Sequence, residues 1–242
     1  MTPQPEIVGL LDGLATTRAI RRYTDEPVSD EQLATILWAA TRAPSGSNRQ
    51  PFRFLVLRQG RRAVEARRIL GAAARRMWGS KRETDGYAAG SGAAEHSPKA
   101  RMAVTMQHYT DHLADAPVIV LAAMVRYREP TPFEGASVYP ACQNLLLAAR
   151  AIGLGGVLTQ IQLLAEEDLH AVLGVPEDVA LHATITLGHP AGGHGPVRRR
   201  PIAELVFEDG WSEPAPWATD PPGTRFAQAG PPRTGTPAPG RP

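Results

Sequence analysis

Two short segments of the sequence carry side chains that could hold a phosphate and a flat polar ring. The first is residues 17–23, in which Arg18, Arg21 and Arg22 place three arginines within five positions. Guanidinium groups stay charged in proteins and pair with phosphate through parallel hydrogen bonds. This segment is therefore suited to a phosphate monoester, although a solvated helix end would have the same composition.

The second segment is residues 43–52, with the sequence APSGSNRQPF. After Pro44, the hydroxyl and amide side chains of Ser45, Ser47, Asn48 and Gln50 can hydrogen-bond to the polar edge of a heterocycle or to a ribityl chain. An ordinary polar turn is the alternative, because the same residue types dominate turns. Together the two segments are suited to a phosphorylated ligand with a flat, polar ring.

The elements around these segments can be predicted from caps and periodicity. Ser29 and Gln32 have the spacing of a capping box, which predicts a helix over residues 30–42. A strand is expected at 53–58, directly after the polar loop. The arginine-rich stretch 61–78 predicts a helix, and the Gly, Ala and Ser content of 79–100 predicts a mobile excursion or lid.

The second half of the sequence continues the alternation of helices and strands. Residues 134–152 are apolar on nearly every face, which is typical of a helix buried on all sides and indicates a partner subunit. The remaining expected elements are a strand at 118–125, a turn at 153–156 leading into a strand to 160, a helix at 164–174, and strands at 181–187 and 202–207. The expected class is α+β in a layered sandwich.

Composition excludes several classes of protein. The 242 residues include 26 Lys and Arg against 24 Asp and Glu, for a net charge of +2, which gives no reason to expect a nucleic-acid partner. The longest apolar run, 116–125, is about half of the roughly 20 residues that a membrane span needs. The first ten residues do not form a secretory signal, and the single Cys142 cannot form an intramolecular disulfide. We therefore expect a cytoplasmic protein without membrane segments.

The end of the sequence differs from the rest. Residues 212–242 contain nine prolines and four glycines and no Leu, Ile, Val or Met. Such a segment cannot bury enough apolar surface to offset the entropy of ordering, so we expect one domain over 1–211 and a disordered tail over 212–242.

In combination these segments resemble the nitroreductase family. The likeness is carried by residues 17–56, by the glycines of 153–156 after a buried helix, by the LGHP sequence at 187–190, and by Arg199-Arg200-Pro201 before a short strand and Trp211. The resemblance implies a three-layer α/β/α sandwich with a mixed, mostly antiparallel sheet. It also implies a homodimer with two sites for flavin mononucleotide (FMN) at the subunit interface and ping-pong hydride transfer from NADH or NADPH to a small organic acceptor, such as a nitro compound, quinone or enone.

The resemblance further assigns residues to the cofactor. Those expected to bind FMN are Arg18, Ala19, Arg21, Arg22, Pro44, Ser45, Ser47, Asn48, Gln50, Leu158, Thr159, Gln160, Arg198, Arg199 and Arg200. Two departures stand out, because many members have Ser where this chain has Ala19, and some nitroaromatic-reducing members have a Pro and an acidic residue at positions like 158–160. No protein acid or base is needed for the first half-reaction, so no catalytic residue is named.

Other interpretations receive less support. His108 and His112 share one helix face, but no third metal ligand with matching spacing follows. Cys142 is expected to be a packed thiol, and Leu158 breaks the glycine pattern of a dinucleotide-binding loop. Alternatives that stay open are a specialised member that desaturates a substrate or breaks down the flavin, and a non-enzymatic flavin-binding protein. A nucleic-acid-binding protein is disfavoured because the sequence has no binding helix or aromatic platform.

Overall fold

The computed structural model describes residues 7–87 and 89–227, which fall into two compact units. The first unit is Met1–His194 and the second is Gly195–Pro242. Of the helices in the described part, none is long and apolar enough to cross a membrane.

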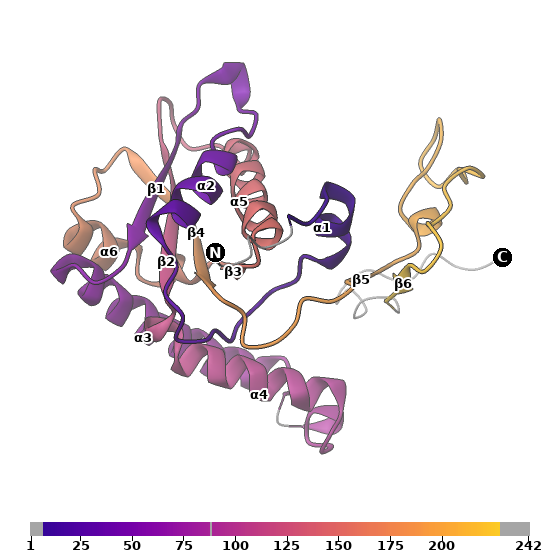
Figure 1. Cartoon of the computed structure of the whole chain (residues 1–242), viewed down its shortest axis with the longest axis horizontal. Helices are drawn as coiled ribbons and strands as arrows, with labels where there is room; N and C mark the ends of the chain where they lie inside the picture. The colour runs from indigo at the N-terminus through magenta and orange to yellow at the C-terminus, as the bar shows by residue number, and fades with distance from the viewer. Residues whose placement is uncertain (1–6, 88, 228–242) are drawn as a thin grey trace, which may run out of the picture. The chain divides into compact units, whose positions relative to one another are not determined.

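The centre of the first unit is a four-stranded sheet with the order β1-β2-β4-β3 (Figure 1). Its strands are β1 (Phe52–Leu57), β2 (Val118–Val125), β3 (Gly155–Thr159) and β4 (Val179–Gly188), and neighbouring strands are antiparallel. Ala19 adds a single parallel bridge to Gly156 of the edge strand β3. The sheet is therefore mixed and mostly antiparallel, as predicted.

Helices cover both faces of this sheet. On one face α2 (Asp30–Ala40) and α5 (Tyr139–Ala151) pack against alternate residues of β2, and on the other α3 (Arg61–Thr84) and α6 (Glu166–Leu173) pack against the residues between them. Because both faces are buried, β2 is apolar along its whole length. The three-layer α/β/α arrangement is confirmed. The other helices of this unit are α1 (Leu10–Thr16) and α4 (Pro98–Asp111).

Local sequence signals set several helix ends where they were expected. The Ser29 hydroxyl accepts a hydrogen bond from the backbone of Gln32, and the Gln32 side chain accepts one from the backbone of Ser29, so the capping box is formed. Helix α6 ends at Gly174, whose φ of 67° is the left-handed conformation that favours glycine at this position. Ser97 caps α4, whose start was not predicted, by accepting a hydrogen bond from the backbone N–H of Ala100.

Three predicted elements differ from the structure. Helix α3 continues to Thr84 and α4 begins at Pro98, so both ends of the expected excursion at 79–100 are helical, and the segment between the two helices is shorter than predicted. The predicted strand at 202–207 is wrong: residues Ile202–Glu204 form a 3₁₀ turn. The prediction that 134–152 is buried on all sides is not met within this chain, because Gln143 is exposed and Leu147 is only partly buried.

The second unit contains little regular structure. Strand β5 (Arg198–Arg199) pairs in parallel with β6 (Arg225–Phe226), and the indole of Trp217 donates a 2.9 Å hydrogen bond to Glu208. The described part of the expected tail, residues 212–227, thus has turns and one short strand. Residues 228–242 of that tail lie outside the described residues, and the domain boundary at 211 stays a prediction.

Candidate functional site

The predicted phosphate-binding arginines lie together in a cavity of about 490 Å³ at the β3 edge of the sheet. The bridge from Ala19 to Gly156 brings the arginine segment to this edge, and the first turns of α4 supply another wall. The cavity is lined by Arg18, Ala19, Ile20, Arg21, Arg22, Pro98, Arg101, Met102, Thr105, Ala191, Gly192 and Gly193.

The cavity is strongly cationic. It has four arginines and no acidic side chain in its lining, and among the described residues Arg18, Arg21 and Arg22 form no ion pair. The Nε atom of Arg21 is buried without a hydrogen-bond partner. Grouped guanidinium charges and a buried N–H without an acceptor destabilise the folded protein unless a bound anion neutralises the charges and accepts the hydrogen bond. These residues therefore fit a phosphate group such as that of FMN.

Backbone contacts and the hydroxyl of Tyr23 hold the arginine segment in place. The backbone N–H of Ile20 donates to the carbonyl of Gly156 at 3.0 Å, and a Cβ at Gly155 would come within 2.7 Å of Ile20, so this approach requires glycine. The Tyr23 hydroxyl donates to the carbonyl of Ile20 at 2.8 Å. Burial raises the pKa of Tyr23 and of Tyr109, so both side chains stay neutral hydrogen-bonding groups.

The second predicted segment forms a tight loop with an unusual backbone. Ser47, Asn48 and Gln50 have φ values of 53°, 52° and 49°, a conformation that non-glycine residues adopt rarely. The Ser45 hydroxyl accepts a 2.8 Å hydrogen bond from the backbone of Gln50, and the Gln50 amide donates to Asn48 at 3.2 Å. Such strained conformations are concentrated at ligand sites, where the surrounding structure imposes them.

Within one chain the loop and the arginine cavity lie far apart. The loop precedes Phe52, which starts the edge strand β1 and pairs with Met124 near the end of β2. The cavity adjoins Gly156 at the start of the opposite edge strand, β3. The start of β3 pairs with the end of β4, which in turn pairs with the start of β2, whereas the loop lies near the end of β2. The two segments therefore occupy opposite ends and opposite edges of the sheet. A single chain does not bring them together.

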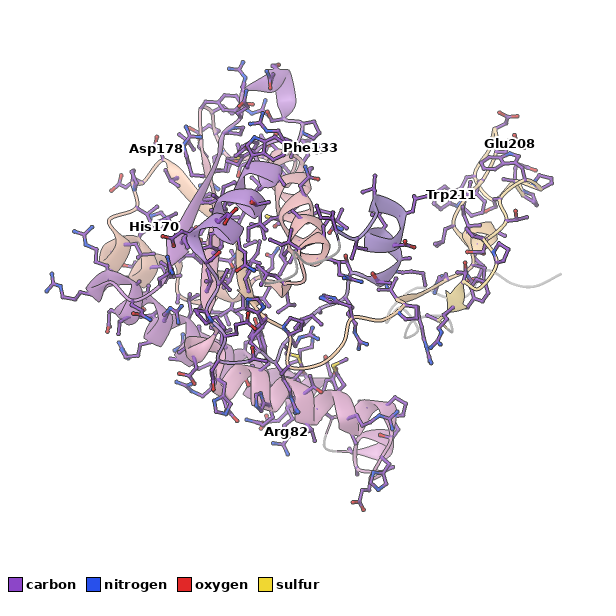
Figure 2. The ribbon with its side chains drawn as sticks, in the orientation of Figure 1. Arg82, Phe133, His170, Asp178, Glu208 and Trp211 are labelled. Carbon is purple, nitrogen blue, oxygen red and sulfur yellow. The ribbon has the colours of Figure 1, made fainter. Side chains whose placement is uncertain are left out.

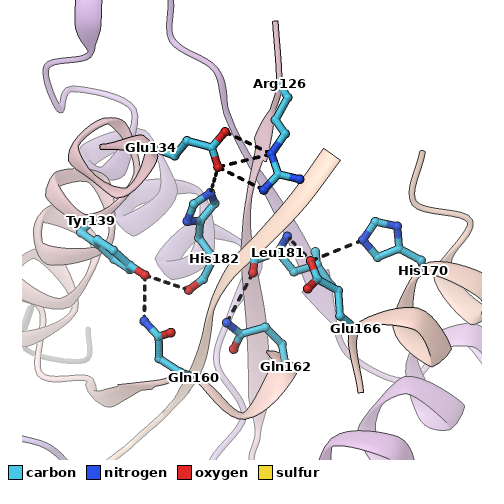
Figure 3. Close-up of polar contacts among 9 residues, drawn as sticks. All are labelled: Arg126, Glu134, Tyr139, Gln160, Gln162, Glu166, His170, Leu181 and His182. Carbon is cyan, nitrogen blue, oxygen red and sulfur yellow. Dashed lines mark hydrogen bonds and ion pairs between the residues drawn. The ribbon is translucent and has the colours of Figure 1, made fainter. Parts of the chain in front are cut away.

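The residues at the end of β3 lie toward the loop. Gln160 donates a 2.7 Å hydrogen bond from its amide to the hydroxyl of Tyr139, which in turn donates to the carbonyl of His182 at 3.4 Å (Figure 3). Ser137, two residues before Tyr139, contacts the loop by accepting from the backbone of Gly46 at 3.4 Å. Thr159 donates to the carbonyl of Thr184, and Leu158 packs against the core that faces α2 and α5.

A charged cluster lies next to Tyr139 (Figure 3). The guanidinium of Arg126 pairs with the buried carboxylate of Glu134 at 3.1 Å, and the Nε2 atom of His182 lies 3.9 Å from that carboxylate. His182 occupies a bulge where the register between β2 and β4 shifts. Burial lowers the pKa of His182 despite the nearby carboxylate of Glu134.

Some predicted residues stay untested and some site residues were not predicted. Arg198, Arg199 and Arg200 belong to the second unit, so their return to the phosphate remains a prediction. The sequence interpretation missed Arg101, because it expected no helix to begin near 98 and so gave no reason to place that arginine beside Arg18. It also missed Tyr139, and the only signal was a polar tyrosine beside Pro140 at the start of an apolar helix.

The fold and the cationic cavity define an α+β protein whose grouped arginines fit a phosphorylated ligand, and comparisons with known proteins identify its family. Residues 14–189 match the nitroreductase family, and the chain belongs to it. The chain is therefore an enzyme of the oxidoreductase class.

Three similar proteins show how widely the family likeness extends. The NADH dehydrogenase of Thermus thermophilus is 31% identical, with 78% of this chain and 91% of that protein covered. The 5,6-dimethylbenzimidazole synthase of Rhodospirillum rubrum is 30% identical, with 82% of this chain and 87% of that protein covered. A protein from Desulfovibrio desulfuricans, solved in complex with FMN, is 33% identical with a TM-score of 0.61, and the match covers 87% of this chain and 99% of that one.

Proposed function

We propose that this protein is an FMN-dependent NAD(P)H oxidoreductase that works as a homodimer and reduces a small organic acceptor such as a nitro compound, quinone or enone. The single observation that carries the proposal is the arginine cavity at the β3 edge, whose lining includes Arg21 with its buried, unpartnered Nε. A similar protein of known structure contains FMN, and another is named an NADH dehydrogenase. When bound, FMN supplies the hydride-accepting and hydride-donating ring.

The chain's own residues would have three tasks at this site. Arg18 and Arg21 bind the phosphate by charge-assisted hydrogen bonds. The loop of Ser45, Asn48 and Gln50 offers a rigid set of donors and acceptors to the ring and ribityl chain. Gln160, held by Tyr139, presents its side chain at the end of the edge strand.

The separation of the two segments supports the homodimer. Because the loop and the cavity are at opposite ends of the sheet, a complete site requires the loop of a second copy. Exposed apolar side chains on α1 and α2 offer a surface for that copy, including Leu10, Leu14 and Trp38, which is 64% exposed. A cavity of about 380 Å³ on the same surface, between α1, α2 and α5, has a mainly apolar lining.

A cytoplasmic location is part of the proposal. Cys142 is the single cysteine, and it is buried in α5. Burial raises the pKa of its thiol to about 12, so it stays a protonated, packed thiol with no disulfide role. Such cysteine use fits a reducing compartment.

Anaerobic titration tests the function directly. Purified protein should be yellow, and adding NADH or NADPH without oxygen should bleach the flavin absorbance at a ratio of about one nucleotide per bound FMN, since hydride transfer carries two electrons. Adding a quinone or nitroaromatic should then restore the colour. Yellow protein whose absorbance does not respond to either nucleotide would instead be a flavin-binding protein without this activity.

One comparison favours a second candidate, breakdown of the flavin itself. The relative from Rhodospirillum rubrum is named for 5,6-dimethylbenzimidazole, and the dimethylated benzene ring of that product also occurs in the isoalloxazine of FMN. Incubation with excess reduced FMN in air distinguishes the two functions. Flavin cleavage would destroy the absorbance permanently and release a benzimidazole detectable by mass spectrometry, whereas the oxidoreductase would return intact FMN.

A further inference from the structure

A second cavity of about 440 Å³ lies along α4 and shares Arg22 with the first. Its wall combines α4 with Arg82, which belongs to the end of α3 that runs beside α4 (Figure 2). The cavity is lined by Arg22, Arg82, Ala103, Val104, Gln107, His108, Asp111 and His112. The function proposed above gives none of these residues a task.

The two cavities together hold more positive charge than one FMN phosphate needs. A phosphate dianion is balanced by two cations, which Arg18 and Arg21 supply, and this leaves Arg22, Arg82 and Arg101. None of the three forms an ion pair within residues 7–87 and 89–227. Positive charge therefore remains for a second anionic group beside the first.

Two other arginines of α3 have partners of their own. Arg68 pairs with Glu65 at 2.7 Å on the surface of the same helix. Arg67 donates to four backbone carbonyls, including that of Leu57 at 2.9 Å. Arg82 has neither kind of partner among the described contacts, so its cationic head is available to a ligand in the second cavity.

The second cavity also offers flat and hydrogen-bonding groups. The rings of His108 and His112 lie with centroids 4.7 Å apart, and both side chains are exposed, so they offer aromatic surface to a base. Its one acidic residue, Asp111, accepts hydrogen bonds of 3.1 and 3.0 Å from Gln107. Two arginines with aromatic surface nearby suit a phosphate on the ribose of a nucleotide.

NADPH differs from NADH only in a phosphate on the 2′-oxygen of its adenosine ribose. We propose that the second cavity binds this 2′-phosphate through Arg22 and Arg82, so that the enzyme prefers NADPH to NADH. This inference rests on the proposed function, in which a nicotinamide nucleotide must reach the flavin beside the first cavity. Arg22, which lines both cavities, would connect the two phosphate sites.

The test uses adenosine 2′,5′-bisphosphate, which carries the 2′-phosphate without the nicotinamide, and 5′-AMP, which lacks it. Calorimetric titration of the purified dimer should give at least about tenfold tighter binding of the bisphosphate, since one charge-assisted hydrogen bond is worth a factor of about ten or more. Arg82→Ala should remove about tenfold of this preference. Arg61→Ala, at the start of the same helix and away from both cavities, should remove none.

Kinetics give a second measurement. The ratio of kcat/KM for NADPH to that for NADH should exceed one in the native protein and should fall about tenfold in Arg82→Ala. Equal affinities for the two adenosine probes, or a ratio that Arg82→Ala does not change, would overturn the inference. Protein that binds the bisphosphate through Arg82 but holds no FMN would support this site and overturn the proposed function instead.

Discussion

The side-chain amide of Gln160 lies 2.7 Å from the hydroxyl of Tyr139 and donates a hydrogen bond to it. This bond joins the end of the edge strand β3 to the start of α5 and fixes the position of a residue expected beside the flavin. The same tyrosine donates to the carbonyl of His182, so its hydroxyl is both acceptor and donor. Tyr139 is therefore a positioning residue for Gln160.

Tyr139→Phe should slow reduction of the flavin by about three- to tenfold, because the lost hydrogen bond is worth roughly 0.5–1.5 kcal/mol. Gln160 would then sample several rotamers, and the visible spectrum of the bound flavin should shift. Stopped-flow mixing with NADPH or NADH measures the rate. Tyr127→Phe is the control, since that hydroxyl has no partner among the described hydrogen bonds. A variant with native rate and spectrum would exclude this role.

Arg21→Ala and Arg18→Ala should each weaken FMN binding by about 10- to 100-fold, because a charge-assisted hydrogen bond contributes roughly 1.5–3 kcal/mol. Titration of flavin-free protein, followed by fluorescence quenching of FMN, gives the dissociation constants. Arg61→Ala removes an arginine outside the cavity and should leave them unchanged. If all three variants bind FMN like the native protein, the cavity does not hold the phosphate.

Much of the fold was predictable because its signals are local. The capping box at Ser29, the glycine stop at Gly174 and the unbroken apolar run of β2 each fix one element by short-range physics, and the structure confirms all three. The end of α3 was not predictable in this way. Its sequence past residue 78 lacks apolar periodicity, and the contact with α4 keeps it helical.

The candidate site was predictable in composition but not in arrangement. The arginine segment and the polar loop were found by residue type, yet only the sheet topology shows that they are at opposite ends of one chain. Arg101 and Arg82 join the cavities through helix packing between α3 and α4. No spacing in the sequence relates either residue to Arg22.

Trp38→Glu should weaken self-association, since it puts a charge into the apolar surface of α1 and α2 where a second copy would bury it. Because Trp38 is 64% exposed in the single chain, the fold itself should be retained. Sedimentation velocity over a range of concentrations measures the dimer, and the flavin content should fall with it. Val64→Glu on α3 is the control, being 57% exposed and away from that surface. Native protein that sediments as a monomer with FMN bound would contradict the shared site.

Stability should fall as the pH is lowered from about 7 to 5, in part through His182. Burial lowers the pKa of His182 in the folded state below its ordinary value of 6.5, with Arg126 adding to this and Glu134 and Glu166 opposing it. The unfolded state therefore binds a proton that the folded state does not, and the free energy of unfolding rises with pH through this window. Urea unfolding at several pH values should show a smaller slope for His182→Gln than for the control His96→Gln, whose side chain is exposed. Equal slopes would mean that the pKa of His182 does not differ between the folded and unfolded states.

The order of substrate binding follows from the site if one surface over the flavin serves both nicotinamide and acceptor. The two cannot then bind productively together, and oxidised and reduced enzyme must alternate. Double-reciprocal plots at several fixed acceptor concentrations should be parallel. Mixing NADPH or NADH with enzyme alone should reduce the flavin at least as fast as turnover. Intersecting lines, with flavin that stays oxidised until an acceptor is added, would show that both substrates bind at once, and the acceptor would then need a surface of its own.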